Sequence, residues 1–385
     1  MEEITLAGRK ILEHLEKNGY EAYFVGGYVR DYLLHLNPND IDIATAATPD
    51  IVESLFPKTK KDAAKYGAVT VYIDNYAFEV TTFREDISYL NHRHPITKFV
   101  SDLNHDLKRR DFTINALAMN LEKKIIDNFQ GLTDLKEKLI KAIGDPSLRF
   151  EEDALRILRA CYFAAKLSFK IEETTALAIK EKASLVSFLS NDRILDELRK
   201  MFNTNNSRLG VKYLMELGIA KHLCSFHDGL NFIYKKELQI TSYELFLGVA
   251  YYSNELIFTD YNISQQTKKK IINATNLLKN FNIYDKLSMY EKSLDDLLYA
   301  NQLAKVLELK YYNNDDIIRL YNELVVKKSS DIAIDVSTLK VLLQKEAGSW
   351  IKPLYQELAG LINEGKIKND KASIEEYLVK EKTNG

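Results

Sequence analysis

Cysteine and proline are both scarce in this chain of 385 residues, which contains two cysteines and six prolines. Cys161 and Cys224 are too few and too far apart in sequence for a disulfide framework or a zinc site, so we expect a reducing, cytoplasmic location. The few prolines, together with only 15 glycines, favour a mainly helical protein. Strand-like segments are confined to the first third of the chain.

The chain also lacks a long apolar run and a large excess of charge of one sign. No stretch approaches the roughly 20 apolar residues of a membrane-spanning helix, and the acidic, amphipathic start does not have the pattern of a signal peptide. We therefore expect no membrane partner. The formal net charge of −2 argues against nonspecific binding of nucleic acid, so an RNA partner would need local basic clusters.

The most informative segment is 23–45, in which a short apolar run ends at Gly26-Gly27 and a helical run follows. A glycine pair lets the backbone approach a ligand closely. The first N–H groups of a helix have no partner within the helix, so they favour a phosphate. This segment predicts a strand, a close turn and a phosphate-binding helix start.

Two aspartates follow this turn in the sequence Asp40-Ile41-Asp42-Ile43, which predicts a strand. Side chains alternate along a strand, so the two carboxylates share one face and the two isoleucines enter the core. Paired carboxylates repel each other unless a cation lies between them, and Mg²⁺ takes oxygen ligands that it shares with substrate phosphates. A lone Gly-Gly is usually a turn and a lone Asp-x-Asp a solvated strand end, but together they favour metal-dependent phosphoryl or nucleotidyl transfer.

These segments belong to a longer, ordered set of motifs. The set consists of GGYVRDYLL at 26–34, DIDIAT at 40–45, RRDFTINALAMN at 109–120 and EDALRILRA at 152–160. In this order the motifs resemble the class II tRNA nucleotidyltransferases, the CCA-adding enzymes that are close relatives of bacterial poly(A) polymerases. The resemblance implies template-independent addition of CCA to the 3′ end of tRNA. Its substrates would be CTP and ATP, its cofactor Mg²⁺ and its second product diphosphate.

The resemblance also implies a fold class and a division into four parts. We expect an α/β head with a small mixed sheet of the nucleotidyltransferase type over 1–143, followed by all-α parts. These are a helical neck that recognises the base over 144–202, a helical body over 203–300 and a helical tail that binds tRNA over 301–385. The sequence leaves the oligomeric state open, with a homodimer as one option.

The resemblance assigns Asp40 and Asp42 as catalytic metal ligands. It matches Glu79, on a predicted strand at 77–83, with a third carboxylate that would position or activate the attacking hydroxyl. The alternative for Glu79 is an ordinary surface strand residue, and the sequence does not decide between the two.

Three residues of the head are matched with nucleotide contacts, namely Gly27, Arg30 and Arg110. Arg110 belongs to the run 108–110, which has three consecutive cations and could neutralise a triphosphate. A solvated turn is the commoner fate of such a run, and it is the resemblance that favours a nucleotide contact. Asn115 is expected to brace the fold.

In the neck, Asp153, Arg156 and Arg159 are spaced three apart on a helix predicted over 151–168, and so would lie along one face. An Asp–Arg pair can accept from the exocyclic amine of cytosine or adenine and donate to the neighbouring ring nitrogen, and it would reject uracil and guanine. Arg159 fits a phosphate or ribose contact. The alternative is an intrahelical ion pair worth ~0.3–0.5 kcal/mol.

Tyr162 departs from the family pattern, because many relatives have an arginine there. Either that nucleotide contact is dispensable, or Tyr162 supplies a hydroxyl or a stacking face in its place.

Residues 84–104 have no clear period and predict a long irregular loop, which is usually functional. The resemblance matches it with a flexible loop needed for the terminal A. CC-adding and A-adding relatives share the other motifs, so both remain alternatives, as does a poly(A) polymerase. A non-enzymatic RNA-binding relative is disfavoured by the presence of Asp40, Asp42 and Arg110.

Overall fold

The computed structural model describes residues 2–38, 40–63, 66–90, 94–280 and 283–384. The chain forms two compact units, residues 1–243 and 244–385. All the strands lie in the first unit, and the described part of the second unit is helical. The predicted fold class, a mixed-sheet head followed by helices, is confirmed.

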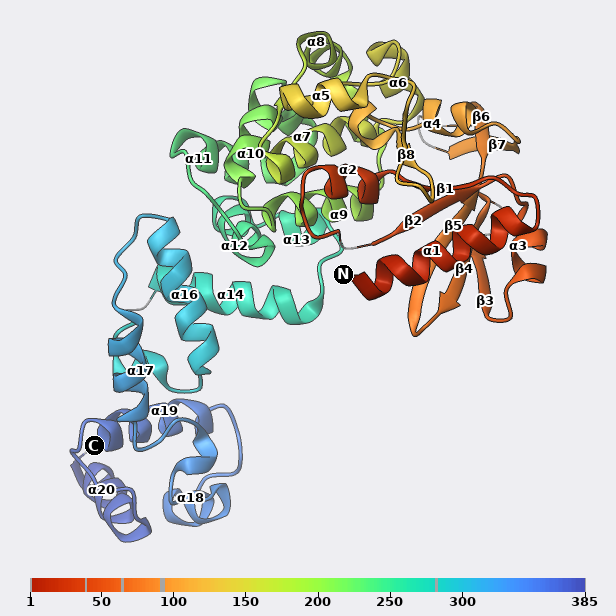
Figure 1. Ribbon diagram of the computed structural model, residues 1–385. Coiled ribbons are helices and arrows are strands. Elements are labelled where there is room, and N and C mark those ends of the chain that lie inside the picture. The colour runs from red at the N-terminus through yellow and green to blue at the C-terminus, as the bar shows by residue number, and fades with distance from the viewer. Residues whose placement is uncertain (1, 39, 64–65, 91–93, 281–282, 385) are drawn as a thin grey trace. The chain divides into compact units, whose positions relative to one another are not determined.

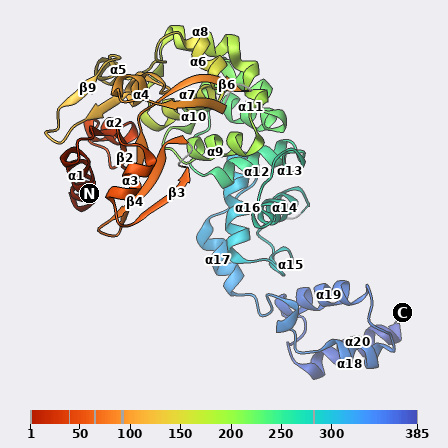
Figure 2. The same ribbon diagram turned by 90° about the vertical axis from the view of Figure 1, so that its right-hand side faces the viewer.

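A seven-stranded mixed sheet forms the base of the first unit, with the order β3-β4-β5-β2-β1-β8-β9 (Figures 1 and 2). Only β2 and β5 pair in parallel. The strands are β1 (Ala22–Val25), β2 (Asp42–Thr45), β3 (Thr59–Ala63), β4 (Ala68–Ile73), β5 (Tyr76–Thr82), β8 (Leu117–Met119) and β9 (Ile125–Asp127). The sequence predicted β1, β2 and β5, whereas β3 and β8 were missed.

The strand register brings the glycine turn and the acidic residues to one place. Val25, the last residue of β1, pairs with Asp42, the first residue of β2. Asp42 is in turn the neighbour of Glu79 on β5. Helix α2 (Gly27–Leu33) begins directly after β1, so its N-terminus lies beside these two carboxylates.

Helices cover the sheet. Helix α1 (Glu2–Lys17) lies along it (Figure 1), and a Cβ on Gly8 would come within 3.0 Å of the Phe24 ring, so helix and sheet are in close contact. Helix α3 (Pro49–Leu55) follows β2. The buried side chains of Ile41 and Ile43 confirm the predicted alternation, although β2 begins only at Asp42.

The expected irregular loop over 84–104 is wrong for most of its length. Strands β6 (Arg84–Leu90) and β7 (His94–Phe99) form an antiparallel two-stranded sheet, hereafter the hairpin, and α4 (Leu103–Lys108) follows. Residues 91–93 lie outside the described residues. The hairpin strands mix charged and polar side chains with exposed apolar ones such as Ile87 and Ile96, so no buried apolar face gives the sequence a strand period to recognise.

The single helix predicted over 151–168 is also wrong, because the structure has two. Helix α6 (Pro146–Glu152) ends before Asp153, whose extended backbone (φ −141°, ψ 101°) separates it from α7 (Leu155–Leu167). The Asp153 carboxylate accepts a hydrogen bond from the backbone N–H of Leu155 at 3.0 Å. Arg156 and Arg159 therefore share a helix, and Asp153 does not lie on it.

The rest of the first unit is helical apart from a short parallel pair, β10 (Leu139–Ile140) and β11 (Lys170–Ile171). Its remaining helices are η2 (Thr113–Asn115), α5 (Gly131–Glu137), α8 (Glu173–Lys182), η3 (Ala183–Phe188), α9 (Asn191–Phe202), α10 (Ser207–Glu216), η4 (Ile219–His222), η5 (Cys224–Phe226) and α11 (His227–Lys235).

The second unit has an apolar core of its own around Leu339, Leu358 and Ile374. Its helices are α12 (Tyr243–Ser253, whose first residue belongs to the first unit), α13 (Ile257–Asp260), α14 (Gln265–Asn280), α15 (Lys286–Met289), α16 (Leu294–Val306), α17 (Asn314–Asn322), η6 (Ser329–Asp331), α18 (Val336–Leu343), α19 (Ile351–Asn363) and α20 (Lys371–Asn384). Among the described residues, no helix is long and apolar enough to cross a membrane. The division into four parts remains a prediction.

Candidate functional site

Three carboxylates gather where β2 and β5 run side by side. Burial raises the pKa of the Asp42 carboxyl; the Arg110 guanidinium opposes this, and the carboxylates of Glu79 and Asp40 raise the pKa further. Asp40 and Glu79 are exposed, whereas Asp42 is half-buried. Asp42 therefore stands at the centre of a negative cluster, and a cation would favour its ionised form.

The glycine turn brings a positive charge against this cluster. Gly26 has φ 66° and ψ −129°, a conformation that other residues rarely adopt. A Cβ on Gly26 would lie 2.7 Å from Nη1 of Arg110 and 3.8 Å from Oδ2 of Asp42. The backbone turn thus touches the Arg110 guanidinium, which leaves no room for a side chain.

Asp106, from α4, holds this arginine in place. Its carboxylate is fully buried and accepts from Nη2 of Arg110 at 3.1 Å and from Nε and Nη2 of Arg109 at 2.9 and 2.7 Å. Burial opposes its ionisation, but Arg110 and Arg109 outweigh burial and lower the pKa of Asp106. Nε of Arg110 is buried with no hydrogen-bond partner among the described residues, so this arginine retains a donor for an anion.

Asp111 binds Arg159 of the neck. Its Oδ2 atom lies 2.7 Å from Nε and 2.6 Å from Nη2 of Arg159, while Oδ1 accepts from the Asn115 amide and from the N–H of Phe112. Burial opposes ionisation of this carboxyl, but Arg159, Asn115 and the Phe112 N–H outweigh it and lower the pKa of Asp111 to about 2. Sequence reasoning missed Asp111, although it lies inside the RRDF motif.

Arg30 is buried in the same network. It is 2% exposed, donates from Nη1 to Oδ1 of Asn115 at 2.6 Å and pairs with the neighbouring Asp31 at 2.6 Å. Its guanidinium carbon lies 5.1 Å from the centre of the Phe163 ring. Asn115 thereby joins Arg30 to Asp111, which agrees with its predicted bracing role. The hydrogen bonds of Arg30 are directed into the protein interior.

Arg156 is surrounded by hydrogen-bond acceptors. Nη1 donates to the carbonyl of Arg149 and to Oε2 of Glu152, both at 2.9 Å. Nη2 donates to the carbonyl of Arg109 at 2.9 Å and to the hydroxyl of Tyr89 at 3.3 Å. The ion-pair partner predicted for Arg156 was Asp153, but the hydrogen-bonded carboxylate is that of Glu152.

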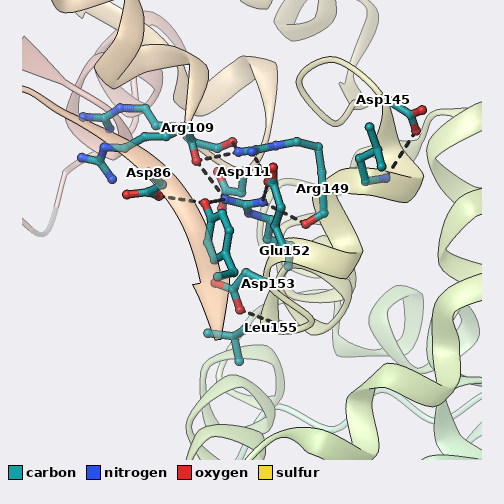
Figure 3. Close-up of polar contacts among 12 residues, drawn as sticks. Asp86, Arg109, Asp111, Asp145, Arg149, Glu152, Asp153 and Leu155 are labelled. Atoms are coloured by element: carbon teal, nitrogen blue, oxygen red, sulfur yellow. Dashed lines mark hydrogen bonds and ion pairs between the residues drawn. The ribbon is translucent and has the colours of Figure 1, made fainter. Parts of the chain in front are cut away.

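Arg149 joins helix α6 to the backbone at Arg109 and Arg110, and Glu152 pairs with Arg149. Arg149 donates to the carbonyls of Arg109 and Arg110 at 2.6 and 2.7 Å and forms an ion pair with Glu152 (Figure 3). Sequence reasoning missed both residues. The carbonyl partners of Arg149 are 40 and 39 positions away, so only the fold could reveal these contacts, whereas Glu152 pairs with Arg149 and Arg156, three and four positions away.

Asp153 and Tyr162 lie at the border of this cluster. Burial lowers the pKa of the Arg156 guanidinium, but Tyr89, Asp153 and Glu152 outweigh it and raise that pKa, so the Asp153 carboxylate is close to Arg156. Burial raises the pKa of the half-buried Tyr162, and charges on Arg30, Glu197 and Arg159 also act on it. The Tyr162 ring packs against Phe163 at 4.9 Å.

The donor set at the acidic cluster fits a hard divalent cation, because it consists of carboxylate oxygens that destabilise one another. Among the described residues, no group of three or more side chains is arranged to hold a metal ion. Asp40 and Asp42 are the carboxylates that would hold such a cation.

Comparison with known families gives three matches that together cover most of the chain, and one of them matches residues 168–229 with the model of a probable RNA and SrmB-binding site of polymerase A. Residues 22–141 match the family model of the poly A polymerase head domain. Residues 235–378 match a model of tRNA nucleotidyltransferase domain 2.

Individual relatives are similar over nearly the whole chain. The CCA-adding enzymes of Bacillus licheniformis and Bacillus subtilis are 33% and 34% identical, and each alignment covers 98% of this chain and 98% of the relative. Among solved structures, the Bacillus stearothermophilus CCA-adding enzyme in complex with CTP has a TM-score of 0.88 at 26% identity. That match covers 98% of both chains.

Proposed function

Because this chain belongs to the family of CCA-adding enzymes, we propose that it adds C, C and A to the 3′ end of tRNA without a nucleic-acid template, using CTP and ATP. The similarity to relatives over 98% of the chain carries this proposal. Three features of the structure support it. The carboxylates around Asp42 would hold a metal, the free Nε of Arg110 would bind an anion, and the polar groups around Arg156 would meet the edge of a base.

The finer proposal for the metal is Mg²⁺ on Asp40 and Asp42. When bound, such an ion would lower the pKa of the attacking tRNA hydroxyl and neutralise charge on the leaving diphosphate. Glu79 is the direct neighbour of Asp42 on the adjacent strand. We assign it the role of positioning the attacking 3′-hydroxyl, which a carboxylate does by accepting its hydrogen bond.

The triphosphate is proposed to bind beside the glycine turn, where the Arg110 guanidinium that lies against the turn would face its charge. Gly26 and Gly27 carry no side chain of their own, and α2 begins at Gly27 with N–H groups that have no partner within the helix. Arg110 has an unpaired Nε donor and is fixed by Asp106. Arg30 is proposed to act indirectly, by holding this part of the head against α7.

Base recognition is assigned to Asp153 and Arg156, with Arg159 and Tyr162 near the sugar and phosphate. Asp153 would accept from the exocyclic amine that cytosine and adenine share, and Arg156 would donate to the adjacent ring nitrogen. Uracil and guanine would place a carbonyl against the Asp153 carboxylate and a protonated ring nitrogen against Arg156, so neither hydrogen bond could form. Since an unpaired buried polar group costs about 1–3 kcal/mol, one Asp–Arg pair can supply the selectivity.

The test is to incubate the enzyme with Mg²⁺, tRNA that lacks its 3′ CCA and each nucleotide singly, then with CTP and ATP together. We expect CTP alone to add two residues, and ATP to add one residue only after both C residues are present. Long tails from ATP alone would indicate a poly(A) polymerase. Addition of C only, or of A only to a tRNA ending in CC, would indicate a partial enzyme.

Two broader assignments accompany this function. We propose that the head, neck, body and tail divide near residues 143, 202 and 300. We also propose a cytoplasmic location, which the two free cysteines support, because an oxidising compartment would favour disulfides.

A further inference from the structure

The terminal nitrogens of Arg156 have no unused hydrogen. Nη1 and Nη2 carry two hydrogens each, and the structure provides four acceptors: the carbonyls of Arg149 and Arg109, the carboxylate of Glu152 and the hydroxyl of Tyr89. If Arg156 donates to a nucleotide base through either nitrogen, one of these four hydrogen bonds has to break first.

The four acceptors differ in how easily they can be lost. Two are backbone carbonyls, at 2.9 Å each, whose positions are fixed by the fold. The third is the Glu152 carboxylate, whose bond is charge-assisted and therefore stronger. Tyr89 is the only neutral side chain among the four, and its bond is the longest at 3.3 Å. It also comes from the hairpin, which is separate from the main sheet. Tyr89 is the acceptor that can leave most readily.

The chemistry of Tyr89 resembles that of a base. Its hydroxyl donates to Oδ2 of Asp86 at 2.8 Å, so toward Arg156 it presents only lone pairs. An unprotonated ring nitrogen of cytosine or adenine presents the same acceptor character. The Tyr89 ring also lies 5.8 Å from the Arg156 guanidinium carbon, which adds a cation–π contact.

On the hairpin, two buried polar atoms near this contact lack hydrogen bonds. Oδ1 of Asp86 and Nε of Arg84 are both buried and without hydrogen-bond partners among the described residues, and they lie 3.9 Å apart. Asp86 faces the cluster of Arg149 and Glu152 (Figure 3). Buried polar atoms that lack hydrogen bonds are costly even within a 3.9 Å ion pair, so this arrangement is less stable than a fully hydrogen-bonded one and can be exchanged at lower cost.

We propose that Tyr89 competes with the incoming base for Arg156: its hydroxyl occupies an Nη2 hydrogen in the free enzyme and has to leave before Arg156 can donate to the base. This inference rests on the proposed function, because it takes Arg156 as the base-reading arginine. Tyr89 is then a residue that sets nucleotide affinity. Since the competent state is only a fraction of the free enzyme, the apparent affinity for CTP and ATP is lower than the intrinsic one.

The test is equilibrium binding of CTP to the full chain with Mg²⁺ but without tRNA, so that no nucleotide is consumed. Tyr89→Phe deletes the hydroxyl and keeps the ring. We expect CTP to bind more tightly by about two- to tenfold, the effect of one net hydrogen bond. Tyr234→Phe is the matched control, because Tyr234 also donates to a carboxylate, that of Glu216, and should leave the affinity unchanged.

A double-mutant cycle tests whether the effect of Tyr89→Phe on CTP binding depends on Arg156. In an Arg156→Ala background, Tyr89→Phe should no longer tighten CTP binding, because the contact that competes is already gone. Unchanged or weaker binding in Tyr89→Phe would overturn the proposal, as would a gain that persists in the Arg156→Ala background. Failure of the unmodified chain to bind CTP at all would count instead against the proposed function.

Discussion

Replacing Asp111 with asparagine tests whether the ion pair between head and neck stabilises the fold. The pKa of the Asp111 carboxyl is about 2 in the folded protein against an ordinary value of 3.8, a difference of 1.8. At 1.36 kcal/mol per pKa unit, the ionised carboxylate contributes about 2 kcal/mol to the free energy of unfolding. Asp111→Asn also leaves Arg159 without its partner. Because the Arg159 side chain is 30% exposed, we expect a total loss of about 2–3 kcal/mol at pH 7, below the 3–5 kcal/mol of a fully buried pair.

The pH dependence follows from the direction of the shift. A folded-state pKa below the unfolded value gives stability that is complete above about pH 5 and is lost as the pH falls through the folded pKa. With values of 3.8 and about 2, roughly half of the contribution, about 1 kcal/mol, is lost by pH 3. The stability difference between the unmodified chain and Asp111→Asn should therefore shrink by that amount between pH 7 and pH 3.

The assay is urea unfolding followed by circular dichroism, fitted with separate transitions for the two units. Asp50→Asn is the control, since Asp50 is 89% exposed and its pair with Lys61 should contribute little. A difference that stays constant from pH 7 to pH 3, or that equals the Asp50→Asn effect, would refute the buried ion pair as the source of stability.

Four further predictions concern the reaction. Asp42→Ala should abolish incorporation of both C and A while tRNA binding persists, measured with radiolabelled nucleotide and by gel shift; near-normal Mg²⁺-dependent turnover would exclude the metal assignment. Gly26→Ala should lower kcat/KM at least about tenfold by displacing the arginine behind it, whereas Gly19→Ala, with φ +86° but nothing within 4 Å, should cost only backbone strain. Asp153→Ser, which keeps a helix-capping residue, should raise misincorporation of UTP and GTP relative to CTP by about one to two powers of ten; a slower but equally selective enzyme would contradict base reading. Shortening the hairpin over 84–99 should spare both C additions and block the terminal A, and equal loss of the two steps would indicate a structural role.

Local patterns predicted the parts of the site that depend on neighbouring residues. The alternation of Asp42 with buried isoleucines was readable because a strand has a period of two. The glycine turn before α2 was readable because the combination of φ 66° and ψ −129° is essentially restricted to glycine. The proximity of Glu79 to Asp42 required the pairing of β2 with β5, which sequence spacing does not determine.

The errors have physical causes as well. The residues around Asp153 have helical propensity and apolar positions three and four apart, so the spacing of apolar residues does not reveal the break between α6 and α7. It depends on an extended residue that caps the second helix. The hairpin was missed because its apolar side chains, such as Ile87 and Ile96, are exposed and do not mark a buried face. The pair between Asp111 and Arg159 joins residues 48 positions apart, and only the fold brings them together.

The central claim is that the protein itself, without a nucleic-acid template, specifies the sequence CCA. The most direct measurement is to supply tRNA lacking its 3′ CCA with all four nucleotides at equal concentration and to sequence the 3′ ends of the products. We expect nearly all extended molecules to end in CCA and extension to stop there. Products with U or G at these positions, or with runs of A beyond the third nucleotide, would contradict it.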